Sequence, residues 1–337
     1  MVNVMTQTVL VTGGNGFVGG WCIVELLRQG FAVRATVRDM RKAEAARVAV
    51  GTQTSTDRLS FVVADLMQDD GWDAAMVGID YVMHVASPLP MGALLDREAL
   101  VPAARDGTLR VLRAAVKAGV KRVVMTSASA TTRQPLNSNT VSNETMWADP
   151  ADPQFDAYRV SKIRAEKAAW EFIGASGGKT ELATILPGAV FGPVLTTDSI
   201  GSVKIIKDLL AGRPAAMPQL GFWVVDVRDL ADAHVRAMTS AKAGNERLIV
   251  AGSFLWMAEI AKILREKLGA KTPTPVLPNW VVRLLVPFMA DLRTLAPLVG
   301  RKFEMDTGKA RRVLGIVPRP IEETLVDCAG SLTAASD

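Results

Sequence analysis

The sequence is poor in the residues that build disulfide frameworks and metal sites. Among 337 residues there are only two cysteines, Cys22 and Cys328, and two histidines, His84 and His234. Two cysteines so far apart make no disulfide framework and no zinc site, so we expect reduced thiols in a cytoplasmic protein and no bound metal. Histidines without a third partner are expected to pack in the core or on the surface rather than act as bases or ligands.

Long apolar runs and runs of one charge are also missing. The first residues, MVNVMTQTVLVTGG, lack the basic flank and apolar core of a signal peptide. The most apolar later stretch, 279–298, contains Arg283, Asp291 and Arg293 and is divided by Pro287. We therefore expect amphipathic helices there and no membrane span. The net charge of +5 is scattered along the chain, so nucleic-acid binding is not expected.

What the sequence does contain is a regular alternation of strand-like and helix-like segments. Apolar, β-branched runs recur at 8–12, 32–37, 59–64, 80–86, 122–126 and 181–186, with longer helical patterns between them. This alternation predicts an α/β fold with a doubly wound parallel sheet of the Rossmann type. Ligands in such sheets bind beyond the carboxyl ends of the strands.

The rhythm changes after about residue 190, where proline-rich loops separate the predicted helices. We expect a dinucleotide-binding domain at 1–190, to which the chain returns at about 222–252. The remainder of 191–337 is expected to form mainly a smaller, mostly helical substrate-binding lobe.

The strongest local signal is the stretch TVLVTGGNGFVGGWCIVELL, in which a strand runs into a glycine loop and then into a helix. Glycines allow the tight turn, the close approach of a pyrophosphate to the main chain, and close packing of helix on strand. The helix N-terminus then offers N–H groups to the phosphates. The loop predicts dinucleotide binding through Gly13, Asn15, Gly16, Phe17, Val18 and Gly19.

The end of the second strand indicates which dinucleotide is bound. An acid at this point favours the ribose 2′-hydroxyl of NAD, whereas basic residues favour the 2′-phosphate of NADP. The sequence has Asp39, but it also has Arg38, Arg41 and Lys42. Three cations against one acid favour NADP(H) over NAD(H).

Tyr158 and Lys162 are four residues apart in a helical pattern and so share one face of the predicted helix. A free phenol has a pKa of about 10, and a neighbouring ammonium favours the phenolate and lowers that pKa. A phenol tuned in this way is a suitable proton donor to a carbonyl group. We therefore predict that both residues are catalytic.

With these motifs in place, the chain resembles an extended short-chain dehydrogenase/reductase. Within that group it is similar to the branch of dihydroflavonol 4-reductase, cinnamoyl-CoA reductase and related microbial aldehyde and ketone reductases. The resemblance spans roughly 8–235 and is carried by VTGGNGFVGG, VRATVRD, ADL (64–66), HVASP (84–88), KRVVMTS, YRVSKIRAEKAAW, LPGAVFGP and VDVRDLADAH.

The resemblance implies a role for each matching residue. Tyr158 would protonate the carbonyl, and Lys162 would hold the nicotinamide ribose and lower the pKa of the tyrosine. Arg38 and Lys42 would hold the 2′-phosphate. The other cofactor contacts that the resemblance implies are Asp65, Leu66, Val85, Ala86, Ser87, Pro187, Val190 and Ser202.

One expected hydroxyl is missing at the end of the fifth predicted strand. The family pattern there is Thr-Ser-Ser with a catalytic last serine, but this chain has Thr126, Ser127 and Ala128. Either Ser127, which we include among the catalytic candidates, or Ser129 replaces it, or Tyr158 and a water suffice at a lower rate. Binding of cofactor with little turnover is the remaining outcome.

These features together predict NADPH-dependent reduction of an aldehyde or ketone to an alcohol. The substrate is expected to be small and largely apolar, with Ser129, Arg133, Phe191 and Trp223 as candidate contacts. The resemblance also implies a homodimer. Two other functions fit the same scaffold: an epimerase or dehydratase that retains its nicotinamide, and a non-enzymatic redox sensor that binds NADP.

Overall fold

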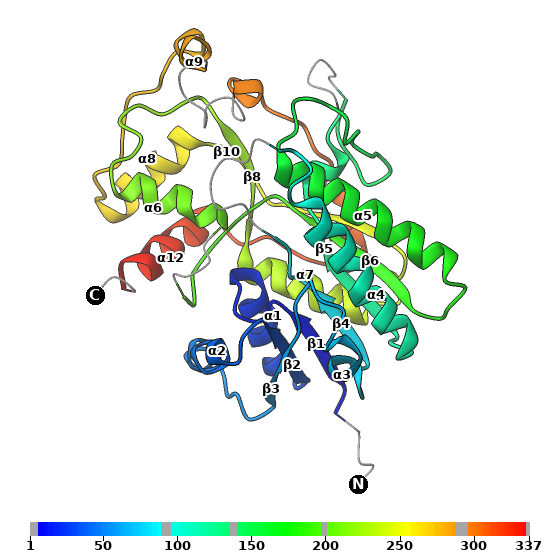
Figure 1. Ribbon diagram of the computed structural model, residues 1–337. Coiled ribbons are helices and arrows are strands. Elements are labelled where there is room, and N and C mark those ends of the chain that lie inside the picture. Colours follow the sequence, from blue (N-terminus) through cyan, green and yellow to red (C-terminus); the bar gives the residue numbers. More distant parts are fainter. Residues whose placement is uncertain (1–5, 89–95, 135–139, 197–200, 287–295, 335–337) are drawn as a thin grey trace.

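The β-branched runs of the first half form one parallel sheet in the computed structural model, which describes residues 6–88, 96–134, 140–196, 201–286 and 296–334 (Figure 1). The sheet has seven strands in the order β3-β2-β1-β4-β5-β6-β9, and every neighbouring pair is parallel. The predicted doubly wound fold is confirmed. The strands are β1 (Thr8–Thr12), β2 (Ala32–Val37), β3 (Leu59–Val63), β4 (Tyr81–His84), β5 (Arg122–Thr126), β6 (Glu181–Pro187) and β9 (Arg247–Val250).

Helices cover both faces of this sheet, as parallel strands with crossover connections require. One face packs against α1 (Phe17–Arg28), α2 (Arg41–Gly51) and α7 (Val227–Thr239). The other packs against α3 (Trp72–Met76), α4 (Gly107–Lys117) and α5 (Ala157–Ala175). Two short helical segments complete this part of the chain. The segment η1 (Pro102–Asp106) precedes α4, and η2 (Ser129–Thr132) follows β5.

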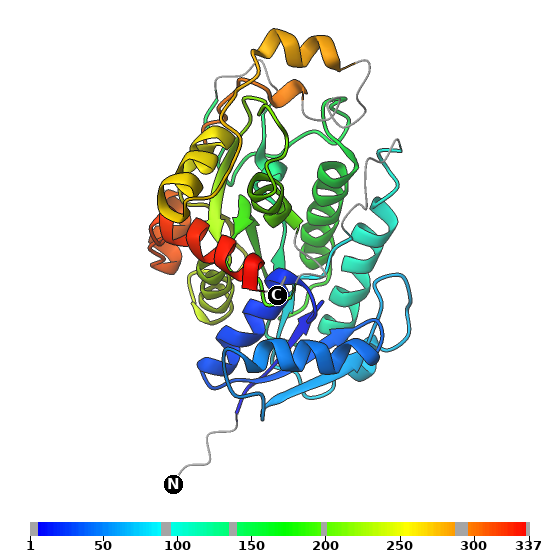
Figure 2. The same ribbon diagram turned by 90° about the vertical axis from the view of Figure 1, so that its left-hand side faces the viewer.

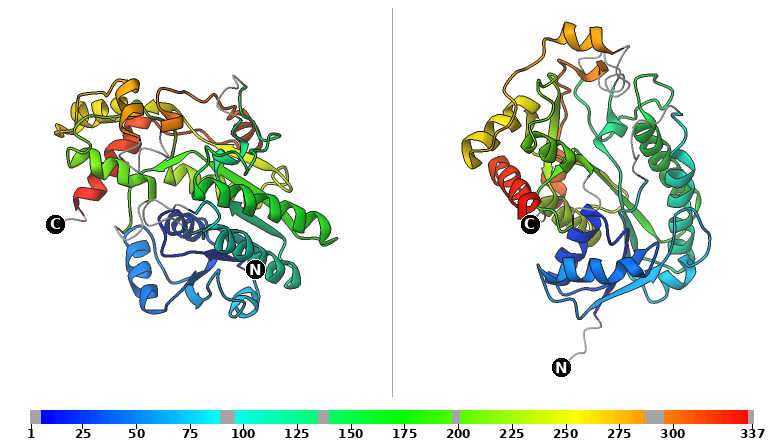
Figure 3. Two further views of the ribbon diagram at one scale, coloured as in Figure 1. Left: turned by 45° about the horizontal axis from the view of Figure 1, so that its top comes forward. Right: turned by 60° about the vertical axis from the view of Figure 1, so that its left-hand side comes forward.

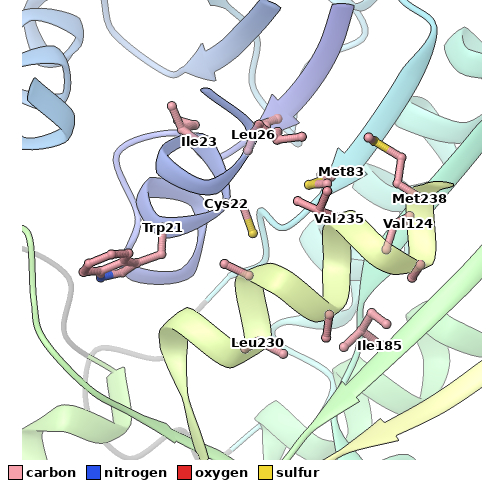
Figure 4. Close-up of a cluster of buried hydrophobic side chains, with 14 of the residues drawn as sticks. Trp21, Cys22, Ile23, Leu26, Met83, Val124, Ile185, Leu230, Val235 and Met238 are labelled. Carbon is pink, nitrogen blue, oxygen red and sulfur yellow. The ribbon is translucent and has the colours of Figure 1, made fainter. Parts of the chain in front are cut away.

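Apolar side chains of α1 and α7 meet the strands in the largest core cluster. Cys22 and Leu26 of α1 and Leu230 of α7 pack in this cluster with strand residues such as Ile185, whereas Trp21 points to the other side of α1 (Figure 4). Each of these side chains is at most 4% exposed. Burial raises the pKa of the Cys22 thiol, so this cysteine is an inert core residue.

The rest of the chain forms a second lobe beside the sheet, seen on one side of the molecule in Figures 2 and 3. Its small sheet has the order β10-β8-β7, with β7 and β8 parallel and β8 and β10 antiparallel. The elements of this lobe are β7 (Ala189–Phe191), η3 (Gly201–Val203), α6 (Lys204–Leu210), β8 (Gly221–Asp226), β10 (Phe254–Trp256), α8 (Met257–Leu268), α9 (Asn279–Leu285), η4 (Ala296–Leu298) and α12 (Ile321–Ala334). Helix α11 (Gly308–Leu314) packs instead against β9 and α7 of the first domain.

The chain returns to the first sheet through α7 and β9, after β8 has joined the small sheet. Ion pairs then join α7 to the segment around α12: Arg228 pairs with Asp327 at 2.7 Å, and Arg319 pairs with Asp229 at 2.8 Å. The start of the apolar stretch 279–298 forms α9, and residues 287–295 lie outside the described part. No helix in the described ranges has the length and apolar character needed to cross a membrane.

Candidate active site

Parallel pairing brings the carboxyl ends of the strands to one edge of the sheet, here called the carboxyl edge. The strand order reverses between β1 and β4, because β1 continues to β2 on one side and to β4 on the other. Such a reversal leaves a crevice between the crossover connections on the two faces. The glycine loop after β1 and the segment after β4 both end at this crevice.

The glycine loop is closed so tightly that side chains cannot be added to parts of it. Gly13 has a φ of +72°, and a Cβ on Gly19 would lie 2.3 Å from the carbonyl oxygen of Gly13. Gly16 caps α1 in extended conformation, and its N–H donates to the same carbonyl at 2.9 Å. The N–H groups that open α1 have no partner within the helix, so they are available to an anion.

Two threonines at strand ends hold this loop, and sequence reasoning did not single them out. The hydroxyl of Thr36 accepts from the N–H of Gly13 at 3.1 Å, and the Thr36 carbonyl accepts from Gly14 at 3.0 Å. The hydroxyl of Thr12 accepts from the N–H of Ala86 at 3.0 Å. A buried threonine at the last or next-to-last position of a strand is the sequence signal that could have identified both.

After β2, the acid is paired with one of the three bases, and within the described residues its carboxylate makes no ion pair with the other two. Asp39 is held by Arg41, whose Nε donates to Asp39 Oδ2 at 2.7 Å. This hydrogen bond lowers the pKa of Asp39 to about 2. Arg38 and Lys42 are exposed, and neither side chain makes an ion pair or hydrogen bond within the described ranges. The two bases named for the 2′-phosphate therefore remain available, while the competing acid is already paired.

The predicted residues after β3 and β4 lie at the same edge. The oxygen Oδ1 of Asp65 accepts from the N–H of Met67 at 2.9 Å, and the carbonyl of Leu66 accepts from Arg110 at 2.9 Å. Three half-buried residues continue directly from the end of β4: Val85, Ala86 and Ser87. Ala86 also lies against the glycine loop, since a Cβ on Gly13 would be 3.1 Å from it.

Tyr158 and Lys162 are brought together in the first turns of α5, as predicted. Asp156 caps this helix by accepting from the N–H of Arg159 at 2.8 Å. The Nζ of Lys162 donates to the carbonyl of Thr126 at the end of β5, at 3.1 Å, and lies 5.9 Å from the centre of the Tyr158 ring. Helix α5 thus carries the phenol and the ammonium to the carboxyl edge.

The pKa of Tyr158 differs in direction from the prediction. Burial raises it to about 12, whereas a neighbouring ammonium was expected to lower it. The physical reason is that burial of the phenol outweighs the lowering effect of the Arg159 charge, while Lys162 directs its Nζ to the Thr126 carbonyl. Burial lowers the pKa of Lys162 to about 8, against the opposing effect of Glu166. At neutral pH the phenol therefore holds its proton.

Ser127 is placed differently from the catalytic role predicted for it. It is 1% exposed, and its hydroxyl donates to Glu166 Oε2 at 2.7 Å. Glu166 follows Tyr158 by eight positions on α5, a separation of about 12 Å along a helix. The Ser127 hydroxyl is thus bonded to a carboxylate that lies two helical turns away from the phenol. This placement argues against a role in which Ser127 and Tyr158 act on the same substrate carbonyl.

Glu166 itself belongs to a buried network that supports the end of β5. It also accepts from Thr184 at 2.9 Å and pairs with Arg247 at 2.8 Å. Arg247 in turn stacks on Trp147, with its guanidinium carbon 3.6 Å from the ring centre, and donates to Thr131 of η2 at 3.1 Å. The network therefore holds η2, the turn that begins at Ser129, in place.

Ser129 is the other candidate for the missing hydroxyl. It is half-buried at the start of η2, directly after Ala128, which is 7% exposed. The Ser129 carbonyl accepts from Thr132 at 2.9 Å, but the Ser129 hydroxyl has no hydrogen-bond partner among the described residues. Ser129, unlike Ser127, therefore has a hydroxyl that is not bonded to another described residue.

Both histidines are buried and hold strand ends in place. His84 bonds Thr12 and Thr108 through its two nitrogens, each at 3.0 Å. Burial, and then the charge of Lys162, lower its pKa to about 3. The Nδ1 of His234 donates to the carbonyl of Leu230, and its Nε2 accepts from the hydroxyl of Thr126 at 2.7 Å. Both histidines therefore pack in the core, and in addition they hold the ends of β1 and β5 in place.

Strand β6 also ends at the carboxyl edge. Pro187 is the last residue of β6 and is buried, and Val190, three residues later in β7, is half-buried. The hydroxyl of Ser202 donates to the carbonyl of Val190 at 2.6 Å. Ser202 therefore joins the predicted nicotinamide-side residues through the backbone of one of them.

The predicted substrate residues divide into core and surface. Phe191 is 0% exposed and packs in the core of the second lobe, so it is a packing residue and not part of a pocket wall. Trp223 is half-buried and donates from Nε1 to the carbonyl of Phe303 at 2.6 Å. Arg133 lies with its guanidinium carbon 4.4 Å from the centre of the Phe303 ring.

Comparisons with known proteins agree with this fold. The NAD dependent epimerase/dehydratase family matches residues 9–252. Cinnamoyl-CoA reductase 1 of Oryza sativa subsp. japonica is 34% identical over 264 residues, 77% of this chain and 75% of that protein. Dihydroflavonol 4-reductase of Dianthus caryophyllus is 30% identical over 272 residues, 77% and 73% respectively. The structure of yeast methylglyoxal/isovaleraldehyde reductase Gre2 complexed with NADPH superposes with a TM-score of 0.81 at 28% identity, covering 98% of this chain and 99% of that one.

Proposed function

The chain belongs to the NAD dependent epimerase/dehydratase family, and from this premise we propose that it is an NADPH-dependent reductase that converts an aldehyde or ketone to an alcohol. The similar proteins are reductases, and the solved neighbour was crystallised with NADPH, so the chain is an NADP-dependent oxidoreductase. The observation that carries the proposed reaction is the placement of Tyr158 and Lys162 on α5 at the carboxyl edge, with Lys162 bonded to the end of β5.

The residues present fit the cofactor. The tight closure at Gly13 and Gly19 leaves room for a pyrophosphate to approach the main chain at the start of α1. Arg38 and Lys42 would hold the 2′-phosphate through charge-assisted hydrogen bonds, since Arg41 already neutralises Asp39. When bound, the reduced nicotinamide supplies a hydride to the carbonyl carbon.

Tyr158 would donate its proton to the carbonyl oxygen. A pKa of about 12 keeps the phenol protonated at neutral pH, and a developing alkoxide is a stronger base than the phenolate left behind. The ammonium of Lys162 lies one helical turn away and would stabilise that phenolate as it forms. General acid catalysis of this kind contributes roughly 10²–10⁴-fold to the rate.

Ser129 would supply the hydroxyl that Ala128 lacks, by donating a second hydrogen bond to the carbonyl oxygen. What supports this choice is the half-buried position of Ser129 and the commitment of Ser127 to Glu166. Trp223 and Phe303 would contact the apolar part of the substrate. The homodimer and the cytoplasmic location stay predictions.

A panel of aliphatic and aromatic aldehydes and ketones, assayed in parallel with NADPH and NADH, tests the proposal. We expect steady oxidation of NADPH in step with formation of the alcohol, and weaker use of NADH. Tight NADP(H) binding with no net consumption against any carbonyl would contradict it. Such a result would favour a nicotinamide-retaining epimerase or dehydratase, or a redox sensor.

A further inference from the structure

Arg133 stands where the first lobe meets the second at the carboxyl edge. It follows η2 directly, and its N–H donates to the carbonyl of Ala130 at 3.2 Å, which ends that turn. Asp156, which caps α5, and Arg159, which follows Tyr158, act on the pKa of both Arg133 and Tyr158. Turn η2 packs against α5, so Arg133, which follows η2 directly, lies near the helix that carries the phenol.

The second lobe supplies an aromatic surface for this guanidinium. Arg133 stacks on the ring of Phe303 at 4.4 Å, and the carbonyl of Phe303 is fixed by Trp223. Trp223 continues the surface through an edge-to-face contact with Phe254 at 6.0 Å. Stacking engages only the face of a guanidinium, and it leaves the N–H donors along its edge to bind a planar anion.

The positive charge of Arg133 has no counter-charge in contact within the described residues. Burial, and then the charge of Arg159, lower its pKa to about 9, and Asp156 and Asp152 act against this. Asp156, however, is engaged by Arg159 through both an ion pair and the helix cap. The carboxylate of Asp156 is therefore already paired with Arg159 and is not a partner of Arg133.

Other buried arginines of this chain show how such a charge is normally satisfied. Arg122 pairs with Glu181 at 2.5 Å, Arg247 with Glu166 at 2.8 Å, and both also donate to main-chain carbonyls. A half-buried guanidinium without such partners is costly unless an anion completes it. Its position directly after η2, which packs against the helix that carries the phenol, indicates that the anion belongs to the substrate.

We propose, resting on the proposed reductase function, that Arg133 binds a carboxylate of the carbonyl substrate, so that the protein prefers oxo acids over neutral carbonyl compounds. The carboxylate would pair with the edge of the guanidinium, and the apolar body of the substrate would lie along Phe303 and Trp223. The carbonyl at the other end would then face Tyr158. Arg133 is thus a specificity-determining residue, and the substrate class is a largely apolar oxo acid.

The kinetic test compares 3- and 4-formylbenzoate with their methyl esters, because each pair differs only in the charge. We expect the wild-type protein to prefer the acid roughly 10- to 100-fold in kcat/KM, the value of a hydrogen bond to a charged group. Arg133→Met should remove this preference, measured as the acid-to-ester ratio of kcat/KM within the same variant, and Arg133→Lys should keep part of it. Arg311→Met, which removes an exposed arginine on α11, is the matched control.

Equal use of acid and ester by the wild-type protein, or an acid preference that survives Arg133→Met, would overturn the proposal. If Arg133→Met does not fold, the wild-type ratio and the Arg133→Lys ratio still decide it. Calorimetric binding of 4-(hydroxymethyl)benzoate to the NADP⁺ complex separates the two proposals. Carboxylate binding that depends on Arg133, without turnover of any aldehyde, would retain the anion site and reject the reductase. Reduction of the aldehyde group of the methyl esters, without binding of 4-(hydroxymethyl)benzoate, would reject the anion site alone.

Discussion

Replacement of Ser127 by alanine should destabilise the protein without disabling its chemistry. The Ser127 hydroxyl donates to Glu166 Oε2 at 2.7 Å in a site where the carboxylate is 0% exposed. A hydrogen bond to a charged group is worth about 1.5–3 kcal/mol. With about 2.1 cal/mol/K of unfolding entropy per residue, 337 residues give about 0.7 kcal/mol/K. The expected fall in Tm is therefore about 2–4 °C.

Differential scanning calorimetry and steady-state NADPH oxidation, on the same preparations, measure the two effects separately. Ser55→Ala is the matched control, because Ser55 makes an equivalent bond to Asp57 at 2.8 Å on the exposed surface, where little stability is expected from it. Ser129→Ala should show the opposite pattern, with Tm unchanged and kcat lower by roughly 10²-fold. A loss of kcat of that size in Ser127→Ala, with Tm unchanged, would refute the structural reasoning and restore Ser127 as the catalytic hydroxyl.

Three further predictions concern the cofactor and the lysine. Replacing both Arg38 and Lys42 by methionine should raise the KM for NADPH roughly 10-fold or more and leave the KM for NADH unchanged; equal losses with both cofactors would contradict a 2′-phosphate site. The kcat/KM should fall as pH rises through about 8, because Lys162, with its pKa lowered to about 8 by burial, loses the charge that stabilises the phenolate; a profile flat to pH 10 would exclude this role. Gly19→Ala should abolish NADPH binding, measured by fluorescence, because its Cβ would lie 2.3 Å from a loop carbonyl, whereas Gly330→Ala, with nothing within 4 Å, should bind normally.

The fold was predictable because its signals are local. The strands at 8–12, 32–37 and 122–126 have the predicted bounds, since β-branched runs buried on both faces end in glycine or polar residues. The position of Tyr158 and Lys162 on one helix was predictable for the same reason, because four-residue spacing fixes a shared face. The three-residue strands β7 and β10 carry too few residues to give a pattern.

The parts that could not be predicted depend on contacts between distant segments. Ser127 and Ser129 are both serines near one strand end, and only the position of Glu166, 39 residues after Ser127, separates their roles. The pKa of Tyr158 was predicted to fall because sequence spacing places an ammonium nearby. Spacing does not report the burial of the phenol, which reverses the direction of the shift. Phe191 likewise looked like a pocket residue until its burial was known.

The central claim is that the phenol of Tyr158 donates a proton to a carbonyl at the carboxyl edge. It is tested most directly by kcat for NADPH oxidation in Tyr158→Phe, measured beside the dissociation constant for NADPH. We expect kcat to fall roughly 10²–10⁴-fold while the dissociation constant stays at the wild-type value. A Tyr158→Phe protein that reduces the same carbonyl at the wild-type rate would contradict the claim.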